Sequence, residues 1–145
     1  GKEYLSAIIC IRYSVLSKWA ENKRIGFTTY SDLANKTEIE SLITSETKKV
    51  NDTLPDKQRI KKFVLLYKEF DADDDELTRT KKLRRNFVIK KYSDIVEALY
   101  GDKKTIDINT SVKLQDGGVQ KINTKLNIIN MENINGIWFF NSIIG

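Results

Sequence analysis

The chain has 145 residues and a formal charge of +5, and 40% of its residues are hydrophobic while 31% are charged. These proportions are typical of one globular domain and exclude a disordered polypeptide, and no apolar run approaches the roughly 20 residues that a membrane-spanning helix requires. The absence of histidine and the single cysteine, Cys10, exclude a Cys/His zinc site, a Ser-His-Asp triad and an intrachain disulfide.

The N-terminal third predicts a strand followed by helices. Residues 4–11 form an isoleucine-rich apolar run, which indicates a buried strand with its cysteine in the core. Residues 13–23 carry apolar side chains at helical spacing and predict a helix. Thr37 and Glu40 match a capping box, in which each side chain bonds a backbone amide of the first turn, and they predict a helix over residues 38–51.

The middle of the chain predicts a second strand, a charged loop and a helix. Residues 60–70 have a dense apolar centre that is typical of a strand. Residues 71–76 contain five carboxylates and residues 78–85 are basic without an apolar period, so both are expected to be loops. From Asn86 onward apolar residues recur every three or four positions, which predicts one continuous helix capped by Gly101.

The last third predicts a β-hairpin. Residues 105–114 alternate between apolar and polar, residues 119–129 form a second strand-like run, and Asp-Gly-Gly lies between them. The order of elements predicts an α+β fold with a small sheet, flanking helices and a C-terminal β-hairpin. We expect one domain over residues 1–131 and an apolar tail over residues 132–145, which we expect to pack against this domain.

The acidic segment has part of the pattern of a calcium loop. Asp71, Asp73 and Asp75 have the spacing of the first three ligands of an EF-hand. Glu76 stands where that loop needs glycine, and Lys82 stands where it needs a bidentate glutamate. We therefore predict no metal site and interpret the segment as a solvated, flexible loop.

The basic segment that follows suits an anionic ligand. Between Arg79 and Lys91 the chain has seven basic residues and no acidic ones, a composition that can hold phosphate or carboxylate groups. No aromatic side chain is interleaved with them before Phe87, so nucleic acid is not predicted as a partner. On composition alone, a solvated surface loop is the better explanation of the segment.

A longer stretch carries a family resemblance. Residues 63–85 read FVLLYKEFDADDDELTRTKKLRR. This stretch resembles the C-terminal region of bacterial AMP-forming long-chain acyl-CoA synthetases, in which a segment of the form FxLLxKEFDADDxELTRTxKLRR occurs. The resemblance extends over about residues 4–129, continues into the predicted helix at residues 92–100, and leaves the tail outside the family pattern.

The resemblance implies the lid domain of an adenylate-forming ligase, with Lys82 as its catalytic lysine. In the family the lysine before LRR enters the active site during adenylation of the fatty acid, and the lid then rotates to help form the thiolation site. The full-length enzyme would use ATP, Mg²⁺ and CoA and act in the cytoplasm, or at the periphery of the inner membrane. The phosphate-binding loop, the adenine motif and the ribose-binding aspartate of the family lie in an N-terminal adenylation domain, which we expect as the partner of this chain.

The expected consequence is that the chain alone binds no cofactor and is catalytically inactive. An alternative of another class is a non-catalytic binding module whose basic loop holds an anionic partner such as nucleic acid.

Overall fold

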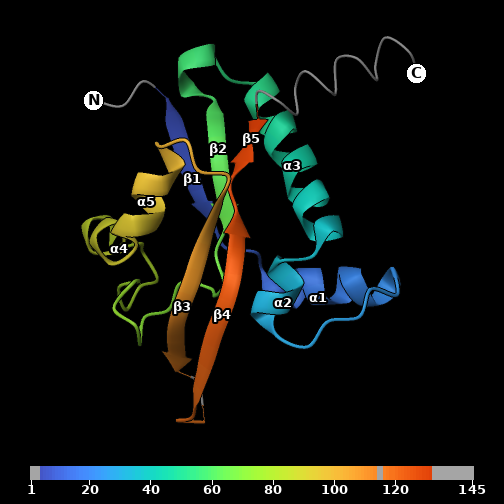
Figure 1. Cartoon of the computed structure of the whole chain (residues 1–145), viewed down its shortest axis with the longest axis vertical. Coiled ribbons are helices and arrows are strands. Elements are labelled where there is room, and N and C mark those ends of the chain that lie inside the picture. Colours follow the sequence, from blue (N-terminus) through green and yellow to red (C-terminus); the bar gives the residue numbers. More distant parts are fainter. Residues whose placement is uncertain (1–3, 114–115, 132–145) are drawn as a thin grey trace.

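Residues 4–113 and 116–131 are described by a computed structural model, and they form an α+β fold with helices on both sides of a small sheet (Figure 1). The predicted tail, residues 132–145, lies outside the described residues. In chain order the elements are β1 (Leu5–Ile9), α1 (Tyr13–Asn22), α2 (Tyr30–Ala34), α3 (Thr37–Asp52), a 3₁₀ helix (Asp56–Gln58), β2 (Ile60–Leu65), α4 (Arg85–Lys91), α5 (Ser93–Leu99), β3 (Thr105–Lys113), β4 (Val119–Asn127) and β5 (Ile129–Asn130).

The strand β2 is the centre of the fold. It pairs in parallel with β1 and antiparallel with the two-residue β5, so the sheet order is β1-β2-β5. Phe63 and Leu65 point into one hydrophobic cluster, and Val64 and Leu66 point into another. A strand buried on both faces needs apolar side chains at consecutive positions, which explains the unbroken apolar run in the sequence.

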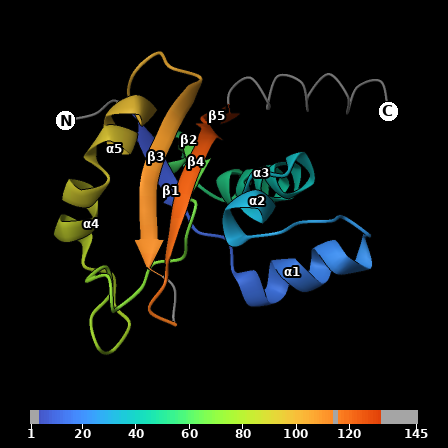
Figure 2. The same ribbon diagram turned by 60° about the horizontal axis from the view of Figure 1, so that its bottom comes forward.

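The helices lie in two groups on opposite sides of the sheet (Figures 1 and 2), and each group packs on its own hydrophobic cluster. Helices α1, α2 and α3 cover one face of the sheet through residues such as Leu16, Leu33 and Ile39. Helices α4 and α5 and the hairpin of β3 and β4 form the other cluster, which includes Ile95 and Ile108. The half-buried Cys10 packs against this second cluster, and burial of its thiol raises the pKa of Cys10 to about 12.

The hairpin agrees with the sequence prediction. Strands β3 and β4 pair antiparallel in continuous register from Thr105 opposite Asn127 to Lys113 opposite Val119. Gly117 in the connecting turn has φ +88°, a conformation that glycine adopts without steric cost. Among the described residues, none of the helices combines the length and the apolar character that crossing a membrane requires.

The single helix predicted from Asn86 to Gly101 is wrong, because two helices meet at Tyr92. This residue has φ −107° and ψ 32° and is only 2% exposed. Its ring lies 6.4 Å from that of Tyr67 and 6.3 Å from that of Phe70, measured between centroids. The apolar period continues through the break because residues on both helices face the same hydrophobic cluster.

The predicted capping box at the start of α3 is also wrong. The N-cap is Lys36, which makes no side-chain capping bond, and the Thr37 hydroxyl instead donates to Glu38 Oε1 at 2.8 Å. The carboxylate of Glu40 accepts a hydrogen bond of 3.0 Å from Asn127 in β4. A contact between residues so distant in sequence has displaced the local bond that the motif predicts.

Candidate functional site

The acidic residues that follow β2 form a closed turn. In this acidic turn, residues 71–76, the Glu76 amide donates to the carbonyl of Asp71 and the Asp75 amide donates to that of Ala72, both at 3.0 Å. The Asp71 side chain accepts from the Asp73 amide at 2.9 Å, and Asp75 adopts a φ of 62°. The turn is therefore ordered by its own backbone and reverses the chain within six residues.

Glu76 is the last residue of the acidic turn and its side chain is fully buried, with 0% exposure. Its carboxylate accepts hydrogen bonds from the ammonium of Lys68 and the hydroxyl of Tyr92. It also accepts from the Asp71 amide and forms an ion pair with Lys91, each at 3.0 Å. Burial of a carboxylate is costly unless its charge is neutralised and its oxygens are hydrogen-bonded, and both conditions are met here.

The protonation states of this cluster follow from the same contacts. Burial alone would raise the pKa of Glu76, but the hydrogen bonds from Lys68, Tyr92 and Lys91 outweigh it and hold the pKa below its ordinary value. Burial would lower the pKa of Lys68, yet Glu76 and Asp74 keep that pKa above its usual value. Burial and the adjacent Glu76 raise the pKa of Tyr92, which therefore stays protonated and donates.

These contacts correct the prediction of a solvated loop. The side chains of Asp71, Asp73 and Asp75 are exposed as expected, whereas Glu76 is not. Among the described residues, no group of three or more carboxylates or thiols is arranged to hold a metal ion.

The basic residues after Glu76 form a second turn, the lysine loop, residues 78–82. Leu77 and Leu83 pair in an isolated antiparallel bridge and close the loop at its base. The Thr78 amide donates to the carbonyl of Lys82 at 2.8 Å, and the Thr78 hydroxyl accepts from the amide of Lys82 at 3.1 Å. Lys81 adopts a φ of 63°, which allows the chain to reverse between the two leucines.

Lys82, the predicted catalytic residue, is exposed at the end of the lysine loop. Its backbone is held by Thr78 on both sides, but its ammonium makes no hydrogen bond or ion pair with any residue that the structure describes. The ammonium is thus available to an anion from outside this chain, while its point of attachment is fixed.

The neighbouring Lys81 is exposed too but contributes to a different surface. It lines a cleft of about 670 Å³ together with aromatic residues such as Tyr13, Tyr30 and Phe70, and Lys82 is not among the lining residues. The loop therefore gives its two lysines different surroundings.

Arg84 connects the lysine loop to the acidic turn. Its amide donates to the carbonyl of Glu76 at 2.9 Å, and its guanidinium donates to the carbonyl of Asp75 at 3.0 Å. The guanidinium also lies 5.0 Å from the ring centroid of Phe87. The side chain of Arg84 thus has structural contacts within the chain, whereas the ammonium of Lys82 has no partner among the described residues.

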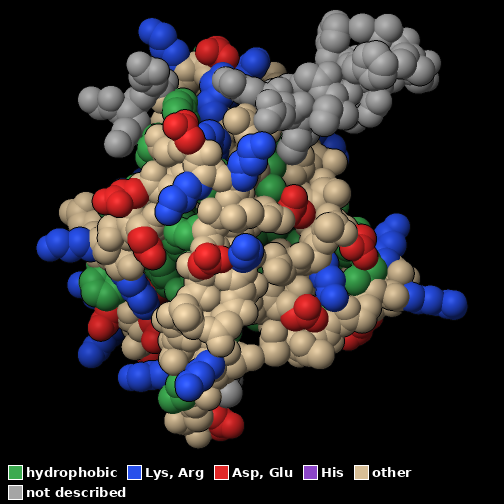
Figure 3. All heavy atoms as spheres, in the orientation of Figure 1, with side chains coloured by type: hydrophobic (Ala, Val, Ile, Leu, Met, Phe, Trp, Pro, Cys, Tyr) green, Lys and Arg blue, Asp and Glu red, His purple; other side chains and the backbone are tan. Residues whose placement is uncertain are grey.

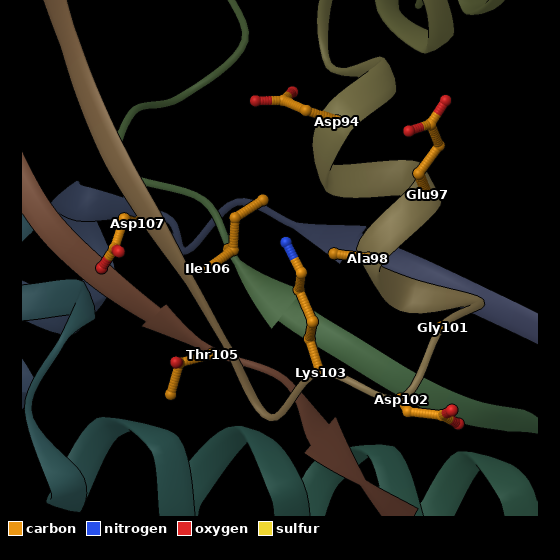
Figure 4. A pocket seen from close by; sticks show the side chains of 9 residues that line it. All are labelled: Asp94, Glu97, Ala98, Gly101, Asp102, Lys103, Thr105, Ile106 and Asp107. Atoms are coloured by element: carbon orange, nitrogen blue, oxygen red, sulfur yellow. The ribbon is translucent and has the colours of Figure 1, made fainter.

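A second hollow of about 640 Å³ lies between α5 and β3 (Figure 4). Asp94 and Glu97 border it from α5, Asp107 borders it from β3, and the side chain of Lys103 extends into the space between these two elements.

Over the face shown in Figure 3, basic and acidic side chains of the described residues are interspersed.

Reasoning from the sequence missed the cluster formed by Lys68, Glu76, Lys91 and Tyr92. Glu76 is one of five acidic residues in a row of six, and nothing in that pattern distinguishes it. A weak signal exists in Tyr92, because a polar hydroxyl at a position in the apolar period of a helix requires a buried partner.

Part of the chain is similar to curated long-chain-fatty-acid–CoA ligases. It is 29% identical over 101 residues to ligase FadD15 of Mycobacterium tuberculosis and equally to FadD15 of Mycobacterium bovis, and each match covers 69% of this chain and 17% of the relative. It is 42% identical over 48 residues to ligase ACSBG2 of Gallus gallus, over 33% of this chain and 6% of that protein. No family model and no solved structure matches the chain.

The matches to FadD15 thus span only 17% of the length of those relatives. They relate the chain to a fragment of a fatty acid–CoA ligase, and they agree with the resemblance seen around residues 63–85.

Proposed function

We propose that this chain is the C-terminal lid domain of a long-chain fatty acid–CoA ligase and that it supplies Lys82 to the adenylation of the fatty acid. The observation that carries the proposal is an exposed lysine whose ammonium has no partner among the described residues, on a loop whose backbone is hydrogen-bonded. The similarity to ligases over part of the chain supports the choice of reaction.

The chemistry requires a cation at this point. A carboxylate oxygen of the fatty acid forms a bond to the α-phosphorus of ATP, and the bond from that phosphorus to pyrophosphate breaks. Two anions approach each other in this step, and negative charge develops on the bridging oxygen that leaves. A lysine ammonium placed between them reduces the repulsion and stabilises the transition state.

Lys82 suits this role through its stem as well as its charge. Lysine presents a compact point charge on a flexible chain of four carbons, whereas an arginine would bring a rigid planar fork. A domain that rotates after the first step withdraws such a group as one body. The thiol of CoA then attacks the acyl carbonyl carbon, and AMP leaves as the thioester forms.

ATP, Mg²⁺, CoA and the fatty acid would be bound largely by the remainder of the enzyme, since the FadD15 relatives extend far beyond the matched region. The N-terminal adenylation domain is accordingly the proposed partner of this chain. We expect no acyl-CoA formation from the 145-residue chain alone.

The test uses the complete gene product that contains this chain. Pyrophosphate release with a fatty acid and ATP measures adenylation, and thioester formation from a supplied acyl-adenylate and CoA measures the second step. Lys82→Ala should lower adenylation by about 10²- to 10³-fold and leave thioester formation unchanged.

Lys81→Ala is the matched control, because it removes an equally exposed lysine from the same loop. Equal losses from both variants would show that the loop contributes only general charge. A wild-type protein that forms no acyl-adenylate would refute the proposal and favour the alternative of an anion-binding module.

A further inference from the structure

The reaction proposed above uses Lys82 but leaves the buried carboxylate of Glu76 without a role. Glu76 stands at the base of the lysine loop, directly before the Leu77–Leu83 bridge. Burying a carboxylate at the base of an exposed loop costs free energy, which argues against a residue that only fills space.

The side-chain contacts of Glu76 come from two separate parts of the chain. Lys68 extends from the segment after β2, Lys91 lies at the end of α4, and Tyr92 lies at the break between α4 and α5. All three donate to the one carboxylate. Its backbone carbonyl also accepts from the Arg84 amide on the returning side of the loop, at 2.9 Å.

Glu76 therefore joins both ends of the lysine loop to the core. The outgoing end is fixed by the carboxylate, and the returning end is fixed by the carbonyl that accepts from Arg84. Between these ends only Thr78 holds Lys82, through short contacts inside the loop. The loop can keep its internal shape and still tilt if its base is released.

We propose that Glu76 is the positioning residue of Lys82: its buried carboxylate, held by Lys68, Lys91 and Tyr92, fixes the lysine loop at the angle from which the ammonium reaches the reacting groups. The inference rests on the proposed function for its catalytic consequence. A displacement of about 1 Å in a reacting group can cost on the order of 10²-fold in rate, so loss of this anchor affects the chemical step.

The experiment compares the wild-type complete protein with Glu76→Gln, which keeps the shape of the side chain and removes its charge. We expect kcat for adenylation to fall by about 10- to 100-fold, with the KM for ATP within about twofold and thioester formation from supplied acyl-adenylate unchanged. Hydrogen exchange measured by mass spectrometry should accelerate in residues 77–83 and remain unchanged in β2 and α5.

Asp74→Asn is the matched control. Asp74 also pairs with Lys68, at 3.0 Å, but no hydrogen bond or ion pair joins it to the described returning end of the loop, residues 82–84. This variant should keep both the wild-type kcat and the slow exchange of residues 77–83. Tyr92→Phe removes a single donor to Glu76 and serves as a milder variant if Glu76→Gln does not fold; its kcat should fall in the same direction by a smaller factor.

The outcomes separate the inference from the function on which it rests. A folded Glu76→Gln protein with wild-type kcat and wild-type exchange would overturn the inference, and a loss of folded protein at unchanged kcat per active site would reduce Glu76 to a purely structural role. Wild-type protein without adenylation activity would refute the proposed function, while the exchange data would still decide whether Glu76 fixes the loop.

Discussion

The acidic turn and the lysine loop are adjacent in the chain, yet their charged side chains differ in burial and pairing. Glu76 is buried and its carboxylate is bonded to three side chains, whereas Lys82, six residues later, is exposed and its ammonium forms no hydrogen bond or ion pair with the described residues. The acidic turn therefore holds the segment in place, and the lysine loop presents a charge that no described residue neutralises.

The physical reason lies in solvation. A buried charge must replace the water that it loses, so the structure surrounds it with donors and loses stability when any of them is removed. An exposed ammonium keeps its hydration and requires no partner, so the fold does not depend on it. Mutations in the two turns should therefore separate stability from activity.

The largest effect on stability is expected from Glu76→Gln. Loss of the charge leaves Lys68 with Asp74 alone, removes the carboxylate that pairs with Lys91 and weakens several hydrogen bonds, so the free energy of unfolding should fall by about 1.5–3 kcal/mol. Urea denaturation at pH 7 measures this change. Asp75→Asn is the exposed control in the same turn and should change it by less than about 0.5 kcal/mol; equal effects would abolish the distinction between the two turns.

Acid should remove the same contribution from the wild-type chain. The pKa of Glu76 in the folded chain lies below its ordinary value of 4.5, so its charge stabilises the fold above about that pH, and this stability is lost as the pH falls through the folded pKa. The difference in unfolding free energy between wild type and Glu76→Gln should be constant near neutral pH and should shrink below about pH 4.5. A difference that widened in acid would contradict the assigned direction.

A smaller loss is expected from Tyr92→Phe. This change removes one hydroxyl donor to Glu76 and keeps the ring contacts with Tyr67 and Phe70, so about 0.5–1.5 kcal/mol of stability should be lost. Thermal unfolding of the two proteins provides the measurement. When combined with Glu76→Gln, the two losses should not add, because both variants alter the same hydrogen bond.

The smallest effect on stability is expected from Lys82→Ala. The ammonium has no partner among the described residues, so unfolding free energy should change by less than about 0.5 kcal/mol. The same variant is expected to abolish most adenylation in the complete protein. A clear loss of stability would reveal that the lysine loop depends on Lys82 for its fold.

Local patterns in the sequence predicted most of the elements. The apolar run of β2, the helical spacing in α1 and the alternation of β3 and β4 each reflect burial of the element's own side chains, and a pattern of that kind is visible in one dimension. The α+β fold and the C-terminal hairpin were predicted on this basis and are confirmed.

The errors concern residues whose partners are distant in sequence. The predicted capping bond of Glu40 is replaced by one with Asn127, which lies 87 positions away. The helix break at Tyr92 and the burial of Glu76 are linked by a hydrogen bond between these residues, which lie 16 positions apart. Neither residue departs from the pattern of its neighbours in the sequence. The role of Lys82 was inferred from a family resemblance, since its own exposed position has no distinguishing physical mark in the sequence.

The rate at which Cys10 is alkylated reports on the region next to the acidic turn. Only thiolate reacts quickly with alkylating reagents, and a pKa of about 12 leaves about one thiolate in 10⁵ at pH 7 while the chain is closed. Because Cys10 is the single cysteine and its thiol interacts with the backbone of Phe70, next to the acidic turn, an opening of that segment would return the thiol toward its ordinary pKa. Faster alkylation of the unmodified chain would therefore indicate that Cys10 has lost part of its burial, without the introduction of a foreign label.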